Sequence, residues 1–189
     1  MPQDAKVTSA SGHTKTNKNP ALAALGDKLY LVYKSGSDNS IWYNYFDGVV
    51  WLEQDRKVTS ASGHSKTNEG PAIAALGSRL YLVYKSGSNN EIWYNYFDGT
   101  SWLEQDLKVT SASGHSRTGY TPALAVYDGK LYLAYKSESN ADIWYNTFNG
   151  ITWLDQDMRV TKNGRVQTGR GPSLAAFKNA LFLAYRDNS

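Results

Sequence analysis

Short apolar runs alternate with polar, turn-forming segments along the chain. In its first part the runs are PALAAL (20–25), KLYLVYK (28–34), IWYNYF (41–46) and WLEQDRKVT (51–59). β-branched and aromatic residues dominate the second and third runs, as is typical of strands. Gly, Pro, Asn, Asp and Ser recur between the runs, and no stretch keeps the 3.6-residue period of a helix. The pattern predicts an all-β chain whose four runs form an antiparallel meander.

The connections between these runs carry the residues of tight turns. Asp-Gly or Asn-Gly follows the third run at 47–48, 98–99 and 149–150. Such pairs supply the two positive φ angles of a type I′ hairpin turn. Only the link from the fourth run to the next first run is long. That link is a polar loop, SASGHSKTN in the copy that begins at Ser60.

The four-run pattern repeats at a fixed period. Val7, Val58, Val109 and Val160 each lie 51 residues apart, and the first two units are identical at 40 of 51 positions. We therefore divide residues 1–189, taken as a single repeat domain, into units 5–55, 56–106, 107–157 and a partial unit 158–189.

Both faces of the second run are apolar, so both faces of each sheet need a cover. Leu29, Leu31 and Tyr33 alternate with Tyr30 and Val32. Stacking like units around an axis covers both faces. We therefore predict a β-propeller of four-stranded antiparallel blades, with about 51 residues per blade and three full blades plus a partial fourth. A β-sandwich is the alternative.

Composition narrows the possible partners. The chain has fourteen Tyr and six Trp, which suit partly wet binding surfaces. Its net charge of +3 is spread without a basic cluster, so nucleic acid is not an expected partner. The chain has no cysteine, and nothing in it points to a metal or a cofactor. No apolar run reaches the length of a membrane span, and the N-terminus lacks the apolar core of a signal peptide; we expect a soluble protein of unassigned compartment.

The segment GPAIAALGSRLYLVYKSGSNNEIWYNYFDGTSW (70–102) resembles blades of bacterial and fungal β-propeller lectins. The seven-bladed fucose-binding type is the most similar, with tectonin- and tachylectin-like proteins more loosely so. The resemblance implies a multivalent, non-catalytic lectin that binds free or cell-surface glycans in grooves between adjacent blades.

Sugar recognition needs fixed hydrogen-bonding groups and an aromatic face for the C–H patch of a pyranose. The polar loop offers His and Thr, and the third run offers a Trp-Tyr pair. The candidate ligand-binding residues are His13, Thr16, Trp42, Tyr43, His64, Thr67, Trp93, Tyr94, His115, Thr118, Trp144 and Tyr145. The fourth loop has Arg165 and Gln167 without a His, which predicts a degenerate or absent site there. Recent duplication, or turn formation by Ser, Thr and Gly, could also explain the repeated loop.

Other repeated residues are expected to build the frame. We expect the tryptophans of the fourth run (Trp51, Trp102, Trp153) to pack between blades. We expect the amide of Asn44 and its equivalents to bond the backbone of a neighbouring blade. Positions that change between units, such as Lys18 against Glu69, are interpreted as solvated turns that tolerate substitution.

Two other functions compete with the lectin. A sialidase-like glycosidase needs an asymmetric carboxylate pair, but Asp55, Asp106 and Asp157 recur in every unit as scaffold residues do. Enzymatic activity is therefore disfavoured, and no catalytic residue is assigned. The second alternative is a protein-interaction propeller, or the targeting module of a larger toxin or hydrolase.

The partial unit has only its first two runs, so the edge of LFLAYR (181–186) would be unpaired. Exposed strand edges pair with other chains. We expect a homo-oligomer in which another copy completes the open blade; a dimer of about seven blades is one form. An open fragment and a four-bladed monomer with one thin blade are the alternatives.

Overall fold

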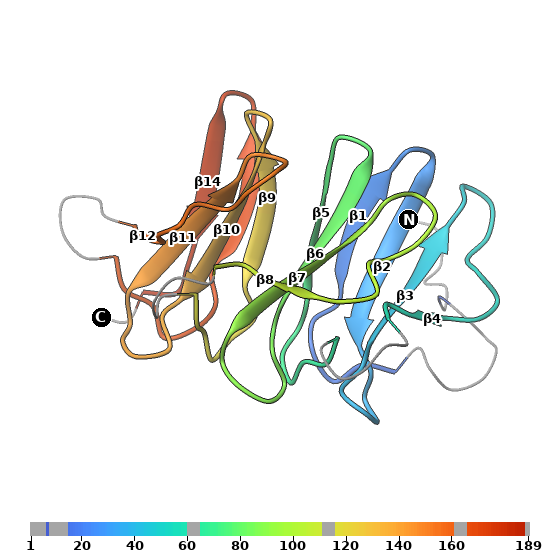
Figure 1. The fold of residues 1–189 in the computed structure, drawn as a ribbon, viewed down its shortest axis with the longest axis horizontal. Coiled ribbons are helices and arrows are strands. Elements are labelled where there is room, and N and C mark those ends of the chain that lie inside the picture. The colour runs from blue at the N-terminus through green and yellow to red at the C-terminus, as the bar shows by residue number, and fades with distance from the viewer. Residues whose placement is uncertain (1–6, 8–14, 60–64, 111–115, 161–165, 188–189) are drawn as a thin grey trace.

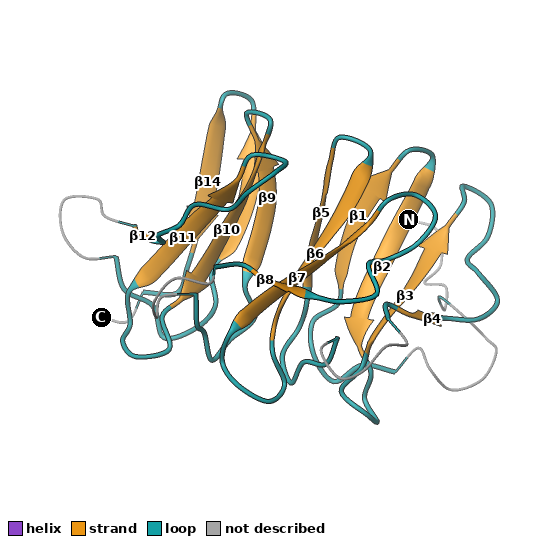
Figure 2. Cartoon of the chain, in the orientation of Figure 1, coloured by secondary structure: helices purple, strands orange, loops and turns teal. Residues whose placement is uncertain are grey.

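The structure, a computed structural model, describes residues 7, 15–59, 65–110, 116–160 and 166–187. These residues form β-strands and no helix (Figure 2). The first sheet consists of β1 (Ala21–Leu25), β2 (Lys28–Lys34), β3 (Ile41–Phe46) and β4 (Arg56–Lys57). The second consists of β5 (Ala72–Leu76), β6 (Arg79–Lys85), β7 (Ile92–Phe97) and β8 (Leu107–Lys108). The third consists of β9 (Ala123–Tyr127), β10 (Lys130–Lys136), β11 (Ile143–Phe148) and β12 (Met158–Arg159). The fourth has β13 (Ser173–Phe177) and β14 (Ala180–Ala184).

Each sheet is an antiparallel meander whose strands follow chain order. The first strands of successive sheets, β1, β5, β9 and β13, lie beside one another, and the sheets fan outward from them (Figure 1). The sheets therefore stack as the blades of a β-propeller, with three complete blades and a two-stranded fourth. This confirms the predicted fold class.

The fourth strand of each blade is shorter than the predicted run 51–59. Trp51 still bridges to Phe46, but regular pairing resumes only at Arg56. The side chain of Asn44 occupies the gap: its Oδ1 accepts a hydrogen bond from Leu52 N (3.0 Å) and its Nδ2 donates to Leu52 O (3.1 Å). The prediction that Asn44 bonds a neighbouring blade was thus wrong, because the amide takes the place of a backbone partner within its own blade.

The hairpins after the third strands also differ from the prediction. Gly48 has φ +98°, but Asp47 is not in the left-handed region. The Asp47 carboxylate instead accepts hydrogen bonds from the backbone of Val49 (2.9 Å) and Val50 (2.8 Å). One glycine and one capping aspartate therefore close this turn, as Asp and Asn commonly do.

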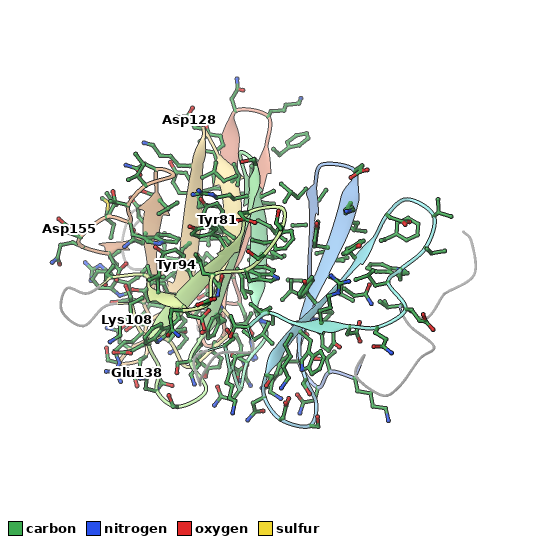
Figure 3. All side chains as sticks on the ribbon, turned by 45° about the vertical axis from the view of Figure 1, so that its right-hand side comes forward. Tyr81, Tyr94, Lys108, Asp128, Glu138 and Asp155 are labelled. Atoms are coloured by element: carbon green, nitrogen blue, oxygen red, sulfur yellow. The ribbon has the colours of Figure 1, made fainter. Side chains whose placement is uncertain are left out.

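Aromatic side chains fill the junctions between blades. Tyr43 of the first blade packs edge-on against Trp102 of the second, with ring centroids 5.6 Å apart, and Tyr30 packs against Phe97 at 5.7 Å. The next junction repeats this arrangement with Tyr94 and Trp153, also at 5.6 Å. Figure 3 shows Tyr81 and Tyr94 on the second blade. Trp102 and Trp153 are buried, which confirms their predicted packing role.

Candidate functional site

A groove of about 770 Å³ lies between the outer parts of the first and second blades. Trp42 and Tyr43 on β3 form part of its lining, and Tyr43 packs against Trp102 of the second blade. The remaining lining residues are Asp55, Arg56, Lys57, Val58, Thr59, Thr100, Ser101, Leu103 and Glu104. Two predicted site residues therefore meet at a junction between blades, where the resemblance implied that sugars bind.

A lysine lies over the tryptophan of this wall. Lys57 Nζ is 5.3 Å from the ring centroid of Trp42, and the second blade repeats the pair with Lys108 over Trp93 at 5.4 Å. Cations at this distance from an aromatic face are attracted by its quadrupole. The register explains the pairing, because Trp42 lies opposite Lys57 and Trp93 opposite Lys108.

Carboxylates hold these lysines in place. Lys108 Nζ is 2.8 Å from Glu91 Oε1, and Lys57 Nζ is 3.5 Å from Asp38 Oδ2. The hydrogen bond from Lys108 lowers the pKa of Glu91 below its ordinary value. Although burial alone would raise it, hydrogen bonds from Ser35 and Ser40 lower the pKa of Asp38 to about 2. Both carboxylates are therefore ionised at neutral pH, and the tryptophan, the lysine and the acid form a connected group.

The aspartate at the end of the groove belongs to the frame. Asp55 Oδ2 accepts a hydrogen bond from the Tyr33 hydroxyl (2.8 Å), and Asp55 Oδ1 accepts one from Asn44 Nδ2 (2.6 Å). In the second blade, Asp106 accepts hydrogen bonds from Ser65 Oγ (2.7 Å) and Asn95 Nδ2 (2.6 Å). These contacts support the scaffold role expected for the repeated aspartates.

Hydroxyl groups remain for a ligand at this groove. Thr100 and Ser101 are part of its lining, and their hydroxyls form no hydrogen bond with any residue that the structure describes. A tryptophan face, hydroxyls and a lysine thus occur together, as small-molecule sites with a few convergent polar groups require.

The predicted threonines do not join this groove. Thr67 is fully buried, and its hydroxyl donates to Glu69 O and accepts from Glu69 N, both at 3.1 Å. Thr118 is equally buried, while Thr16 makes the same local turn in an exposed position. Each hydroxyl thereby closes the turn that precedes an inner strand, which leaves the ligand role of these residues a prediction.

The remaining predicted site residues lie in different parts of the chain. His13, His64 and His115 lie outside the described residues. Trp93 and Tyr94 repeat the positions of Trp42 and Tyr43 on β7, and Trp144 and Tyr145 repeat them on β11. Tyr145 borders an apolar cavity of about 210 Å³ against the two-stranded blade.

Sequence reasoning missed the basic residue that accompanies each tryptophan. Lys57, Lys108 and Arg159 each stand fifteen positions after a tryptophan and two after the scaffold aspartate. This repeated offset was the available signal, but only the β3–β4 register places the two side chains together.

Two general findings bear on function. No group of three or more His, Asp or Glu side chains is arranged to hold a metal ion in the part of the chain that the structure describes. Within the same residues, no helix has the length and apolar character that crossing a membrane requires.

The sequence matches no protein-family model, and no curated protein matches it. Its fold, however, is similar to several solved structures. An α-L-arabinanase of Penicillium chrysogenum has 13% identity and a TM-score of 0.62, with 92% of this chain and 61% of that chain covered. The fucose-recognising, six-bladed lectin of Aleuria aurantia has 14% identity and a TM-score of 0.62, with 91% and 55% covered. Zg3597, a family 117 glycoside hydrolase of Zobellia galactanivorans, has 16% identity and a TM-score of 0.58, with 94% and 67% covered.

These comparisons establish the architecture. The chain spans about 55–61% of the first two similar structures. Since that lectin has six blades, the seven-bladed subtype of the resemblance stays a prediction. Lectins and glycoside hydrolases share this architecture, so the function has to be argued from the residues of the site. The chain thus has the fold of an incomplete β-propeller.

Proposed function

We propose that the chain is a non-catalytic, multivalent lectin that binds glycans in the grooves between adjacent blades. The observation that carries the proposal is the groove between the first two blades, whose lining combines the aromatic residues Trp42, Tyr43 and Trp102 with the basic residue Lys57. Such a groove offers an apolar ring for the C–H face of a sugar, and polar groups at its rim for the hydroxyls. The fold of the Aleuria aurantia lectin supports the proposal by analogy.

The carboxylates of the two described cavities favour binding over hydrolysis. Glycoside hydrolysis uses a pair of carboxylates, one on each side of the scissile bond. The groove is lined by two carboxylates, Asp55 and Glu104, and Asp55 is tied to the frame because it already accepts hydrogen bonds from Tyr33 and Asn44. A second cavity lies where the inner strands β1, β5, β9 and β13 begin; Glu69 is its one lining carboxylate among the described residues, and Lys18 is ion-paired with it.

Repetition makes weak grooves useful. A shallow groove with one ring and a few hydrogen bonds binds in roughly the millimolar to micromolar range. The repeated Trp–Lys pairs at Trp42 and Trp93 provide a second, equivalent position. Linked sites on a rigid frame raise avidity by about 10²–10⁴ against a multivalent glycan.

The test is calorimetric titration with L-fucose and with D-galactose, after a glycan-array screen. We expect Trp42→Ala to lower the number of binding sites per chain while the remaining sites keep their affinity. Tyr45→Ala, on the same strand but outside the groove lining, is the matched control and should leave both values unchanged. Unchanged stoichiometry in Trp42→Ala would place the site elsewhere.

Two results would favour the competing functions. Release of reducing sugar from arabinan or fucosides by the purified chain would make it a hydrolase. Absence of binding to every glycan on the array, together with specific capture of one protein partner, would make it an interaction or targeting module.

We also propose that a second copy of the chain covers the two-stranded blade. At the complete junctions, Phe97 and Trp102 cover the tyrosines of the preceding blade. The equivalent Tyr132 and Tyr145 border an apolar cavity, and Phe182 on the edge strand β14 is 55% exposed. An exposed apolar edge of this kind favours pairing with another chain.

The mass of the chain in solution tests this assembly. We expect light scattering to give a multiple of 21.0 kDa, and Phe182→Asp to lower it towards the monomer. Ile151→Asp changes another exposed apolar residue, 82% exposed and in the turn after β11, and should have no effect. If the wild-type chain is a monomer at every concentration tested, the proposed assembly is refuted, whereas the proposal for glycan binding in the groove is unaffected.

A further inference from the structure

One position near the axis differs in every unit although its surroundings are repeated. A threonine precedes it by two residues and a proline follows it by two residues in all four units. The residues at the position are Lys18, Glu69, Tyr120 and Arg170. Repeated residues build the common frame, whereas four different side chains at one place make an asymmetric surface.

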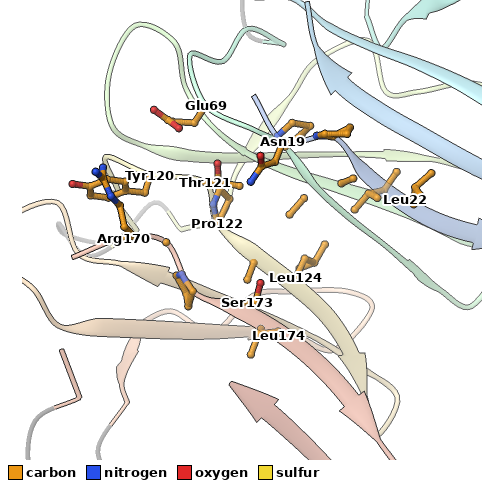
Figure 4. Close-up of a pocket in the computed structure, with 18 residues that line it drawn as sticks. Asn19, Leu22, Glu69, Tyr120, Thr121, Pro122, Leu124, Arg170, Ser173 and Leu174 are labelled. Atoms are coloured by element: carbon orange, nitrogen blue, oxygen red, sulfur yellow. The ribbon is translucent and has the colours of Figure 1, made fainter. Parts of the chain in front are cut away.

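Three of these four residues, Glu69, Tyr120 and Arg170, come together at the start of the inner strands, and in the first unit Asn19, next to Lys18, joins them. A cavity of about 560 Å³ lies there, lined by residues of all four units that include Asn19, Glu69, Tyr120 and Arg170 (Figure 4). The rest of its lining comes from the residues at the start of β1, β5, β9 and β13: prolines, alanines, leucines and an isoleucine, with Gly171, Thr121 and Ser173. The volume falls within the range of about 300–1,000 Å³ that is usual for small-ligand sites. Glu69, predicted to belong to a solvated turn, thus also lines a cavity, and the tolerance of these positions to substitution stays a prediction.

The acidic and basic side chains of this cavity differ in whether they have a partner of opposite charge. Glu69 is the one carboxylate in its lining among the described residues, and Lys18 Nζ neutralises it at 3.0 Å. The Arg170 guanidinium lies over the Tyr120 ring, 5.7 Å from its centroid, and Lys136 Nζ is 5.2 Å from the same centroid. No carboxylate in the described part of the chain forms an ion pair with Arg170. Among the described lining residues, the cavity thus has one cation without a carboxylate partner, Arg170, and this cation lies over an aromatic ring.

Hydrogen-bonding capacity accompanies that charge. Neither the Tyr120 hydroxyl nor the Asn19 side-chain amide has a hydrogen-bond partner within the described residues. Figure 4 shows Tyr120 and Arg170 together on one side of the cavity and Asn19 on another. A planar guanidinium binds a carboxylate through two parallel hydrogen bonds, and amide and phenol groups bind hydroxyls.

We propose that this axial cavity binds a saccharide that carries a carboxylate, such as a hexuronate. Arg170 binds the carboxylate, Tyr120 and Asn19 bind ring hydroxyls, and the proline-rich wall contacts the C–H face of the sugar. The site is separate from the groove at Trp42, and it does not depend on the function proposed for that groove.

Calorimetric titration with D-glucuronate, D-glucose and sodium sulfate tests the proposal. We expect the wild-type chain to bind D-glucuronate at least about tenfold more tightly than D-glucose, because hydrogen bonds to a charged group are the stronger ones. Arg170→Gln should weaken D-glucuronate binding by about tenfold or more, and Tyr120→Phe should weaken it to a lesser degree. Added salt should weaken it as well.

The matched control is Arg79→Gln. Arg79 also lies over a tyrosine ring, 4.5 Å from the centroid of Tyr96, but does not line the cavity. It should leave D-glucuronate binding unchanged. Equal affinity for D-glucose and D-glucuronate, or full D-glucuronate affinity in Arg170→Gln, would overturn the proposal. Sulfate binding as tight as D-glucuronate binding would overturn its saccharide component.

Discussion

Replacement of Asp106 by alanine tests whether the repeated aspartates hold the blades together. Asp106 is 6% exposed and accepts hydrogen bonds from Ser65 Oγ at 2.7 Å and Asn95 Nδ2 at 2.6 Å, and a further one from Tyr84. Alanine would leave three buried donors without their acceptor. Each buried donor left without a hydrogen-bond partner costs about 1–3 kcal/mol. We therefore expect Asp106→Ala to lower the free energy of unfolding by about 3–5 kcal/mol, out of the roughly 5–15 kcal/mol of a typical domain.

Urea unfolding followed by tryptophan fluorescence measures this change. The midpoint should fall while the slope stays the same, because the mutation removes interactions without altering the surface exposed on unfolding. Glu104→Ala is the matched control: Glu104 stands two residues earlier, recurs in the units as Glu or Asp, and is exposed. It should change stability by less than about 0.5 kcal/mol. If Asp106→Ala unfolds within about 1 kcal/mol of the wild type, the network does not stabilise the blade as argued.

Three further predictions follow from contacts described by the structure. Lys108→Gln should raise the pKa of Glu91, as measured by NMR titration. In the folded protein this pKa lies below its ordinary value, so the ion pair stabilises the fold at pH values above the ordinary pKa. This contribution to stability is lost as the pH falls through the lowered pKa. Gly70→Ala should destabilise the chain by about 1–3 kcal/mol in urea unfolding, because the new Cβ would lie 2.6 Å from Asn19 O; no loss would mean that this approach can relax. Trp102→Leu should cost about 2 kcal/mol or more by the same assay, and wild-type stability would contradict its packing role.

Sequence periodicity predicts the frame because strand burial leaves a direct mark on the chain. The 51-residue period sets the units, and the alternation of Leu29 and Leu31 with Tyr30 shows that both faces are covered. The same reasoning fails at the fourth strand, where a side chain, Asn44, replaces a backbone partner. The sequence pattern alone does not show that a side chain acts as a hydrogen-bond partner for the backbone, since Asn also occurs in ordinary turns.

The candidate site was predictable only in part. Trp42 and Tyr43 were placed at a junction between blades, but the lysine over the ring depends on the register of β3 and β4. The threonine hydroxyls were expected to face a ligand, yet that of Thr67 is used in its own turn. Divergent residues such as Glu69 were interpreted as tolerant turns, because a linear pattern does not show which loop ends meet near the axis.

The hydrogen bond between Ser65 and Asp106 has a consequence for how such chains change their length. Both partners belong to residues 56–106, and Ser116 and Asp157 repeat the bond inside 107–157 at 2.7 Å. Each segment therefore contains both the donor and the acceptor of this hydrogen bond. Recombination that inserts or removes one whole segment keeps every such bond and requires only that a new pair of neighbouring blades stack. The number of blades can therefore vary while these bonds are preserved.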